Sequence, residues 1–141
     1  MRLTMADIVL AIKPNWLDLI LSGQKTIEAR RVLPKNLDTG DKVFLYCSGD
    51  IHGVAHVRRV LRTSEDCRNY GIYGMYYIIQ DWCGSKEPSQ HQMSQLSKYM
   101  NGAKASCGGY IALYNVTRYD DPHPWHGSIP KNFIYYRKEK K

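Results

Sequence analysis

Long apolar stretches are absent from this sequence: no run approaches the roughly 20 residues needed to cross a lipid bilayer. The charged and then apolar stretch of an N-terminal secretory signal is also absent, and no repeat or low-complexity tract occurs. These absences argue against a helical membrane protein and a repeat architecture. We therefore expect a soluble, cytoplasmic protein that does not associate with membranes.

Paired cysteines are absent as well. None of the four cysteines belongs to a Cys-x-x-Cys pair: Cys47, Cys67, Cys83 and Cys107. This spacing predicts neither a zinc site nor a redox motif, so we interpret these residues as free buried thiols. His123 and His126 lie beside Trp125 without an acid or thiol at ligand spacing, and we expect no metal and no cofactor.

Acidic residues are in the minority. Lysine and arginine number 20 against 13 acids, a net charge of +7, and this excess favours polyanionic partners such as nucleic acid. Residues 137–141 carry part of the excess, and we interpret them as a basic C-terminal tail. A chain of 141 residues has the length of one domain, so we expect a single domain over residues 1–136 and favour a monomer.

A short helix is predicted near the N-terminus. Pro14 can open it without losing a backbone hydrogen bond, and Gly23 can end it in a left-handed conformation. Apolar residues between them cover most of the helix surface: Trp16, Leu17, Leu19, Ile20 and Leu21. We therefore expect this helix to be buried against a sheet rather than solvated on one side, with Trp16 in the core.

The remaining elements follow from β-branched and aromatic runs bounded by turn residues. Strands are expected at Ile8–Ile12, Thr26–Leu33, Lys42–Cys47, Ile51–Arg62, Met75–Gln80, Tyr110–Tyr119 and Asn132–Arg137. Short helices are expected at Pro14–Ser22, Ser64–Tyr70 and Ser94–Met100, and a proline-rich connection at residues 120–127. Strands of irregular length with a helix after the first predict an α+β fold: a small mixed β-barrel with short helices packed at its openings.

A charged cluster follows the first helix. On a strand, Thr26, Glu28 and Arg30 would share one face, and Lys25 would join them only if the turn at Gly23 reorients it. One interpretation is an ordinary ion pair on the barrel surface, worth at most about 1 kcal/mol. The other is a ligand cleft in which Lys25 and Arg30 hold phosphate or polarise a carbonyl, while Glu28 orients them or accepts a hydrogen bond.

This cluster resembles the opening of the ASCH domain family, a branch of the PUA-like superfamily. The family pattern Gly-x-Lys-x-x-Glu-x-Arg is matched at Gly23, Lys25, Glu28 and Arg30. Strand, Pro-started helix, motif, strand and turn also follow in the family's order through about Leu61; the resemblance fades across Thr63–Gly108 and returns loosely afterwards. It implies a PUA-like barrel whose motif lines a ligand cleft.

Further candidate ligand-binding residues surround the motif. Lys13 and Arg31 flank it in the sequence, and Tyr46 and Ser48 end the third strand, where Tyr46 either stacks on a base or packs in the core. On the long strand, Val57 and Leu61 are expected to face the core. The opposite face is basic and would either follow a phosphate backbone or be solvated: His52, His56, Arg58 and Arg62.

These features favour an RNA-binding module, or one for another nucleic acid, that reads a nucleotide or single strand in the motif cleft. The alternative is an enzyme of the family, a ribonuclease or an acetylcytidine amidohydrolase, with Lys25, Glu28, Tyr46 and Ser48 as catalytic candidates. The amidohydrolases resemble this chain at Lys25, but their nucleophilic threonine corresponds to Glu28 here. A third alternative is a protein-binding regulator that uses the aromatic-rich residues 70–108. Trp125, in its proline-rich loop, is a separate candidate contact residue.

Overall fold

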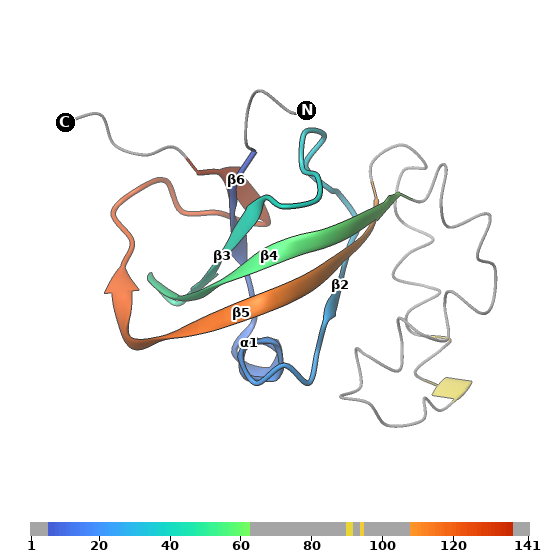
Figure 1. Cartoon of the computed structure of the whole chain (residues 1–141). Coiled ribbons are helices and arrows are strands. Elements are labelled where there is room, and N and C mark those ends of the chain that lie inside the picture. The colour runs from blue at the N-terminus through green and yellow to red at the C-terminus, as the bar shows by residue number, and fades with distance from the viewer. Residues whose placement is uncertain (1–5, 63–89, 92–93, 95–107, 137–141) are drawn as a thin grey trace.

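The structure is a computed structural model that describes residues 6–62, 90–91, 94 and 108–136 (Figure 1). The described elements begin with β1 (Ile8–Ala11) and the helix α1 (Pro14–Leu21). The other strands are β2 (Ile27–Arg30), β3 (Lys42–Cys47), β4 (Asp50–Arg62), β5 (Gly109–Pro124) and β6 (Phe133–Tyr135). All six strands form one sheet in the order β2-β5-β4-β3-β1-β6.

The sheet curls into a half-barrel around the helix. β1 runs parallel to β3, and the other neighbouring strands are antiparallel. β1 and β2 are joined through α1 but do not pair with each other. Across this gap Arg30 Nη2 donates to the carbonyl of Ala11 (2.6 Å), and Arg30 Nη1 donates to Asn132 Oδ1 (2.8 Å). Side chains therefore join the two sides of the barrel where the backbone ladder is interrupted.

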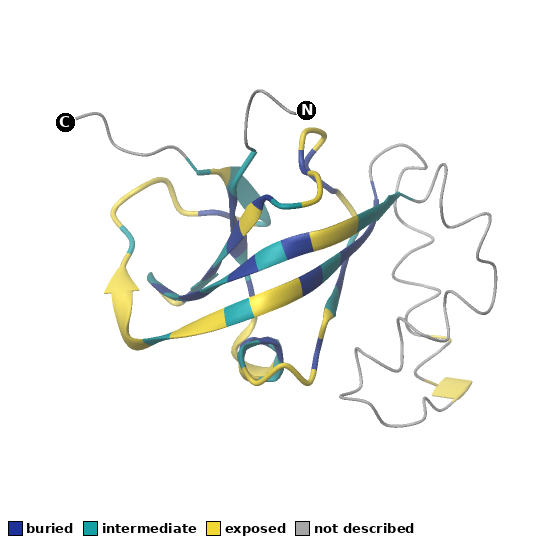
Figure 2. Ribbon diagram, viewed as in Figure 1, coloured by how far each residue is buried: buried dark blue, intermediate teal, exposed yellow. Residues whose placement is uncertain are grey.

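The core is formed by residues of the strands, of α1 and of the connection after β2, and Figure 2 marks the buried residues in dark blue. Its fully buried residues come from several strands, among them Ile8, Leu10, Val43, Leu45, Ala55, Val57 and Ile111. From α1, Leu17 and Ile20 are buried, whereas Asn15 and Asp18 are exposed. The expectation of a helix buried on all sides is therefore wrong, because a helix at the barrel opening contacts the core along one stripe.

A tight hairpin connects β3 to β4. Cys47 pairs with Asp50, and the two residues between them, Ser48 (φ 52°) and Gly49 (φ 92°), are both left-handed. Positive φ at both central positions is the signature of a type I′ turn, whose twist matches that of the flanking strands. Glycine adopts this conformation at little cost, whereas Ser48 does so against the steric preference of its Cβ atom.

An irregularity in the long strand changes which side chains face inward. The pairing of β4 with β5 shifts register between Val57 and Arg59. After the shift, Val60 packs against the core, although the strict alternation of the sequence assigned that role to Leu61. A bulge inserts one residue and reverses the inward and outward alternation beyond it. The prediction that Leu61 faces the core is wrong because of this bulge.

β5 is longer than predicted. Its pairing with β4 continues to Pro124, opposite Asp50, so residues 120–124 do not form the proline-rich connection expected there. β2 pairs with residues 109–112 alone, and prolines are tolerated where a strand lacks a second neighbour. Trp125 follows, half-buried, with its indole N–H donating to Ser128 O (2.9 Å) and its backbone N–H to Gly49 O (2.9 Å).

Several predictions concern residues outside the described ranges. These are the helix at Ser64–Tyr70, the strand at Met75–Gln80, most of the helix at Ser94–Met100, three of the four cysteines and the basic tail. Cys47 is described, and it is the free buried thiol expected. In the described part of the chain, no helix is long and apolar enough to cross a membrane.

Candidate ligand-binding site

The motif residues form a buried ionic network between α1 and β2. Gly23 (φ 81°) ends the helix and turns the chain, and Lys25 is then only 2% exposed. Lys25 Nζ donates to the carbonyl of Ile27, lies 3.8 Å from Glu28 Oε1 and sits 5.7 Å from the centre of the Trp16 ring. The interpretation as an ordinary surface ion pair does not describe this geometry, since both charged groups are withdrawn from water.

Arg30 extends the network toward the far side of the barrel. Its Nη2 lies 3.4 Å from Glu28 Oε2, so the 8%-exposed Glu28 residue contacts a cation on each side. Asn132 accepts from Arg30 and in turn donates to the carbonyl of Val32 (3.0 Å). Among the described residues, no buried side-chain nitrogen or oxygen lacks a hydrogen-bond partner. A fully satisfied network of this kind is rigid.

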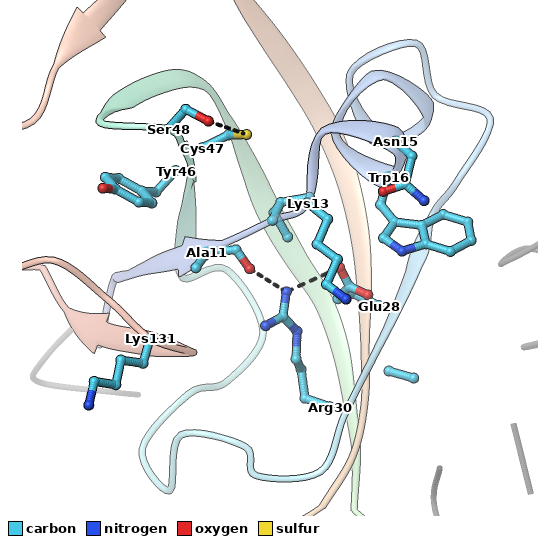
Figure 3. A pocket seen from close by; sticks show the side chains of 12 residues that line it. Ala11, Lys13, Asn15, Trp16, Glu28, Arg30, Tyr46, Cys47, Ser48 and Lys131 are labelled. Carbon is cyan, nitrogen blue, oxygen red and sulfur yellow. Dashed lines mark hydrogen bonds and ion pairs between the residues drawn. The ribbon is translucent and has the colours of Figure 1, made fainter. Parts of the chain in front are cut away.

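A cavity of about 570 Å³ opens beside this network (Figure 3). Its walls are the end of β1, the start of α1, β2 and the end of β3, together with Lys131. Tyr46 and Trp16 lie on opposite sides of it, the Lys13 side chain extends toward Glu28, and the Lys131 side chain lies at the edge of the cavity, apart from Lys13. We call this space the first cavity.

The first cavity is predominantly cationic. Among the described residues that line it, Lys13, Arg30 and Lys131 carry positive charge, and Glu28 carries negative charge. Asn15 and Ser48 add an amide and a hydroxyl. The described residues contain no group of three histidine, cysteine, aspartate or glutamate side chains that would hold a metal ion. The arrangement therefore offers cations, one carboxylate and two aromatic rings to an organic ligand.

Comparison with known proteins identifies the family and the fold. The ASCH domain model matches residues 10–133. The chain belongs to the ASCH domain family. The structure also resembles crystal structures of ASCH from Zymomonas mobilis, with a TM-score of 0.65 and 16% identity over 94% of this chain and 89% of that chain.

Two variants of the Zymomonas mobilis protein give similar matches. The variant with a serine replaced by alanine has a TM-score of 0.61, and the variant with a tyrosine replaced by phenylalanine has a TM-score of 0.59, both at 16% identity. They cover 94% of this chain and 89% and 91% of the respective structures. At this identity the likeness concerns the fold, and it confirms the α+β, PUA-like architecture. No curated protein sequence matches the chain.

The ASCH domain brings together five of the ligand-binding residues named from the sequence. Lys13, Glu28, Arg30, Tyr46 and Ser48 all line the first cavity. Trp16 lines it too; it is half-buried and packs against the core cluster, so its expected burial in the core is only partial. The reason is its position in the first turn of α1, at the rim of the barrel.

Other predicted residues lie elsewhere in the ASCH domain. Lys25 and Thr26 line a different cavity, on the far side of the Lys25–Glu28 pair, and Arg31 is exposed outside both. The predicted basic face is divided, because His52 Nε2 lies 3.1 Å from the Cys47 carbonyl and Arg62 Nη2 donates to the carbonyl of Pro34 (2.9 Å). His56 and Arg58 remain together, beside Tyr114.

Sequence reasoning missed Asn15, Cys47, Lys131 and Asn132. Asn132 is 102 residues from Arg30 in the sequence, yet the two side chains are hydrogen-bonded. Lys131 reaches the cavity and Asn132 reaches Arg30 because β6, which follows them in the sequence, pairs with β1 near the start of the chain. Of the four, only Asn15 could have been found from local sequence, because it lies next to Trp16 in the first turn of α1.

Proposed function

We propose that this ASCH domain binds single-stranded RNA and holds one nucleotide in the first cavity. The observation that carries the proposal is the placement of two aromatic rings on opposite sides of a cationic cavity with a carboxylate at its wall. A volume of about 570 Å³ lies in the range of small-ligand sites, about 300–1,000 Å³. A nucleotide combines the flat apolar base and the anionic phosphate that these walls suit.

The aromatic rings favour a base. Tyr46 and Trp16 are both half-buried and both line the cavity, so each is held by the protein and keeps part of its surface exposed. Stacking of a base on an aromatic side chain contributes about 1–3 kcal/mol and does not depend on base identity. Single strands are favoured over duplexes because their bases are available for such stacking.

The charged residues favour a nucleotide over a neutral ligand. Lys13 and Lys131 are exposed at the cavity, where their flexible ammonium groups can follow a phosphate. Arg30 is fixed by Ala11 and Asn132, but a guanidinium has five N–H donors, more than these contacts use. Glu28 accepts hydrogen bonds and cannot donate when ionised, so it suits an N–H or amino donor on the edge of a base.

The catalytic alternatives find less support in this geometry. Both require Lys25 to act on a substrate, but its ammonium group is buried, donates to Ile27 and faces Glu28 from outside the first cavity. Tyr46 and Ser48 do reach the cavity, and their hydroxyls would contact a bound nucleotide. The protein-binding alternative rests on residues 70–108, which lie almost entirely outside the described ranges.

The proposal is tested by fluorescence anisotropy with a short mixed-sequence single-stranded RNA at two salt concentrations. Lys13→Gln and Lys131→Gln remove charges that line the cavity, and Lys42→Gln removes an exposed charge on β3 as the matched control. Lys25→Ala is a poor probe because it would disturb the buried network. Affinity falls as salt rises, and each lost phosphate contact should make the plot of log K against log salt concentration less steep by about 0.7.

We expect salt-sensitive binding that both cavity variants weaken and Lys42→Gln leaves nearly unchanged. Equal effects of all three variants would place the binding elsewhere on the surface. Absence of binding by the wild-type protein at low salt would overturn the proposal. Electrophoresis of the same RNA after incubation distinguishes binding from cleavage, since a pure binding module leaves its length unchanged.

A further inference from the structure

A second cavity, of about 320 Å³, lies at the other end of α1. The first cavity takes in the start of this helix, at Lys13, Asn15 and Trp16, and the second takes in its end, at Ser22 and Gly23. An eight-residue helix is about 12 Å long at 1.5 Å per residue. The two cavities are therefore close enough for one oligonucleotide to occupy both.

The second cavity has the chemistry of a phosphate and base site. The guanidinium of Arg58 lies 5.4 Å from the centre of the Tyr114 ring, and Tyr114 is 37% exposed. Lys25 also contributes to the wall, and among the described residues that line the cavity none is acidic. His56 packs against Tyr114 from β4 and lies 3.3 Å from the Asn115 carbonyl. Cations beside an exposed aromatic ring are the usual elements of single-strand binding.

Backbone conformation links the two cavities as well. Among the described residues, the non-glycine residues with positive φ are Ser48 (52°) and Asn115 (49°). Ser48 lines the first cavity and Asn115 lines the second. Each cavity therefore has one left-handed non-glycine residue in its wall, where the side chain is held at a turn or strand irregularity.

The exposed side of α1 provides a path between the cavities. Asn15, Asp18 and Ser22 are spaced by three and four residues, which places them along one face of the helix. Asn15 borders the first cavity and Ser22 the second. Asp18 lies between them, with its carboxylate 3.9 Å from the guanidinium of Arg118. Arg118 offsets the negative charge that would otherwise repel a phosphate on this path.

We propose that the second cavity binds the phosphodiester backbone of the same RNA strand whose nucleotide occupies the first cavity. Arg58 contacts a phosphate, and Tyr114 stacks on a neighbouring base. This inference rests on the proposed function and deepens it: the ligand is a single strand of several nucleotides rather than a free nucleoside or mononucleotide. The remaining part of the predicted basic face, His56 and Arg58, then belongs to this site.

The test compares Arg58→Gln with Arg59→Gln, which removes the same charge from the next residue of β4 outside both cavities. Binding of a short mixed-sequence single-stranded RNA is measured by anisotropy over a series of salt concentrations. Arg58→Gln should weaken RNA binding about tenfold. It should also make the plot of log K against log salt concentration less steep by about 0.7. Competition by nucleoside monophosphates, which occupy the first cavity alone, should be the same for Arg58→Gln and the wild type.

Tyr114→Leu and Tyr114→Phe provide an independent test. Loss of the ring should weaken RNA binding, and retention of the ring in phenylalanine should preserve it. If Arg58→Gln and Arg59→Gln bind RNA equally well, and Tyr114→Leu binds like the wild type, the second site is overturned while the first remains. If the wild-type protein binds no RNA at low salt, both the proposed function and this inference fail. Circular dichroism verifies that each variant is folded.

Discussion

The two cavities at the ends of α1 differ in whether their charged side chains are held by ion pairs and hydrogen bonds within the protein. In the first, Glu28 lies between Lys25 and Arg30, and Arg30 is also held by a backbone carbonyl and by Asn132. In the second, Arg58 is exposed and rests on the Tyr114 ring, with no acidic residue among the described residues of the wall.

Because of this difference, we expect the two cavities to recognise different parts of an RNA strand. Groups fixed before binding lose little conformational entropy when a ligand arrives, so the first cavity is suited to reading the shape and hydrogen-bonding edge of one base. An exposed cation adapts to a phosphate at different positions, so the second cavity is suited to a contact that is independent of sequence. The Lys25–Glu28 pair lies between the cavities, with Lys25 on one side and Glu28 on the other.

The largest effect is expected from Lys25→Met, which would impair both cavities together. The substitution retains most of the apolar stem but leaves Glu28 with one cationic partner and the Ile27 carbonyl without this donor. Removing one member of a buried ion pair costs about 3–5 kcal/mol of unfolding free energy. Urea denaturation measures this loss, and Lys42→Met, at an exposed position, should stay within about 0.5 kcal/mol of the wild type. A loss below about 1 kcal/mol would mean that the pair behaves as a surface pair.

Tyr46→Leu should distinguish the contributions of the two cavities to RNA binding, because Tyr46 lines the first cavity alone. Leucine keeps an apolar side chain at the end of β3 but removes the stacking face. The free energy of RNA binding should therefore become less favourable by about 1–3 kcal/mol. Tyr46→Phe should bind nearly as well as the wild type. A matching loss in Tyr46→Phe would instead assign the contribution to the hydroxyl group. Anisotropy with RNA and competition by nucleoside monophosphates both report on this site.

Ser48→Gly should improve stability while reducing binding. Glycine removes the steric penalty of a left-handed residue in the β3–β4 turn, a gain of about 1 kcal/mol in unfolding free energy. The same change deletes a hydroxyl at the first cavity, so RNA affinity should fall. Asn115→Gly is the counterpart at the second cavity, although asparagine tolerates this conformation better and should gain less. A stability gain in Ser48→Gly without any loss of affinity would remove Ser48 from the binding site.

Much of the fold could be predicted from local sequence. The helix after Pro14, the strands on either side of it and the turn at Gly23 depend on neighbouring residues, and the structure confirms them within a few positions. The extension of β5 to Pro124 could not be predicted in this way. It depends on pairing with β4, in a part of β5 that no other described strand pairs with, and prolines by themselves indicate a loop.

The candidate site was predictable to a similar extent. The motif places Glu28 and Arg30 on one face of β2 by strand alternation alone. Arg62 was assigned to a basic face, but it donates to the carbonyl groups of residues 34–37, a contact that depends on how a loop folds back. Lys131 and Asn132 reach the site through the pairing of β6 with β1. Sequence alone carries no signal for contacts between residues so far apart.

The smallest effect is expected at Asp18, on the helix face between the cavities. Asp18 and Arg118 are both well exposed, so Asp18→Asn should change unfolding free energy by less than about 1 kcal/mol. If one strand passes from the first cavity to the second, however, removal of this carboxylate should strengthen RNA binding at low salt, and the gain should vanish at high salt as screening increases. Asp38→Asn removes an exposed carboxylate that lines neither cavity and serves as the matched control. Equal affinities for the two variants would mean that the strand does not follow α1, and the two cavities would then have to be considered as separate sites.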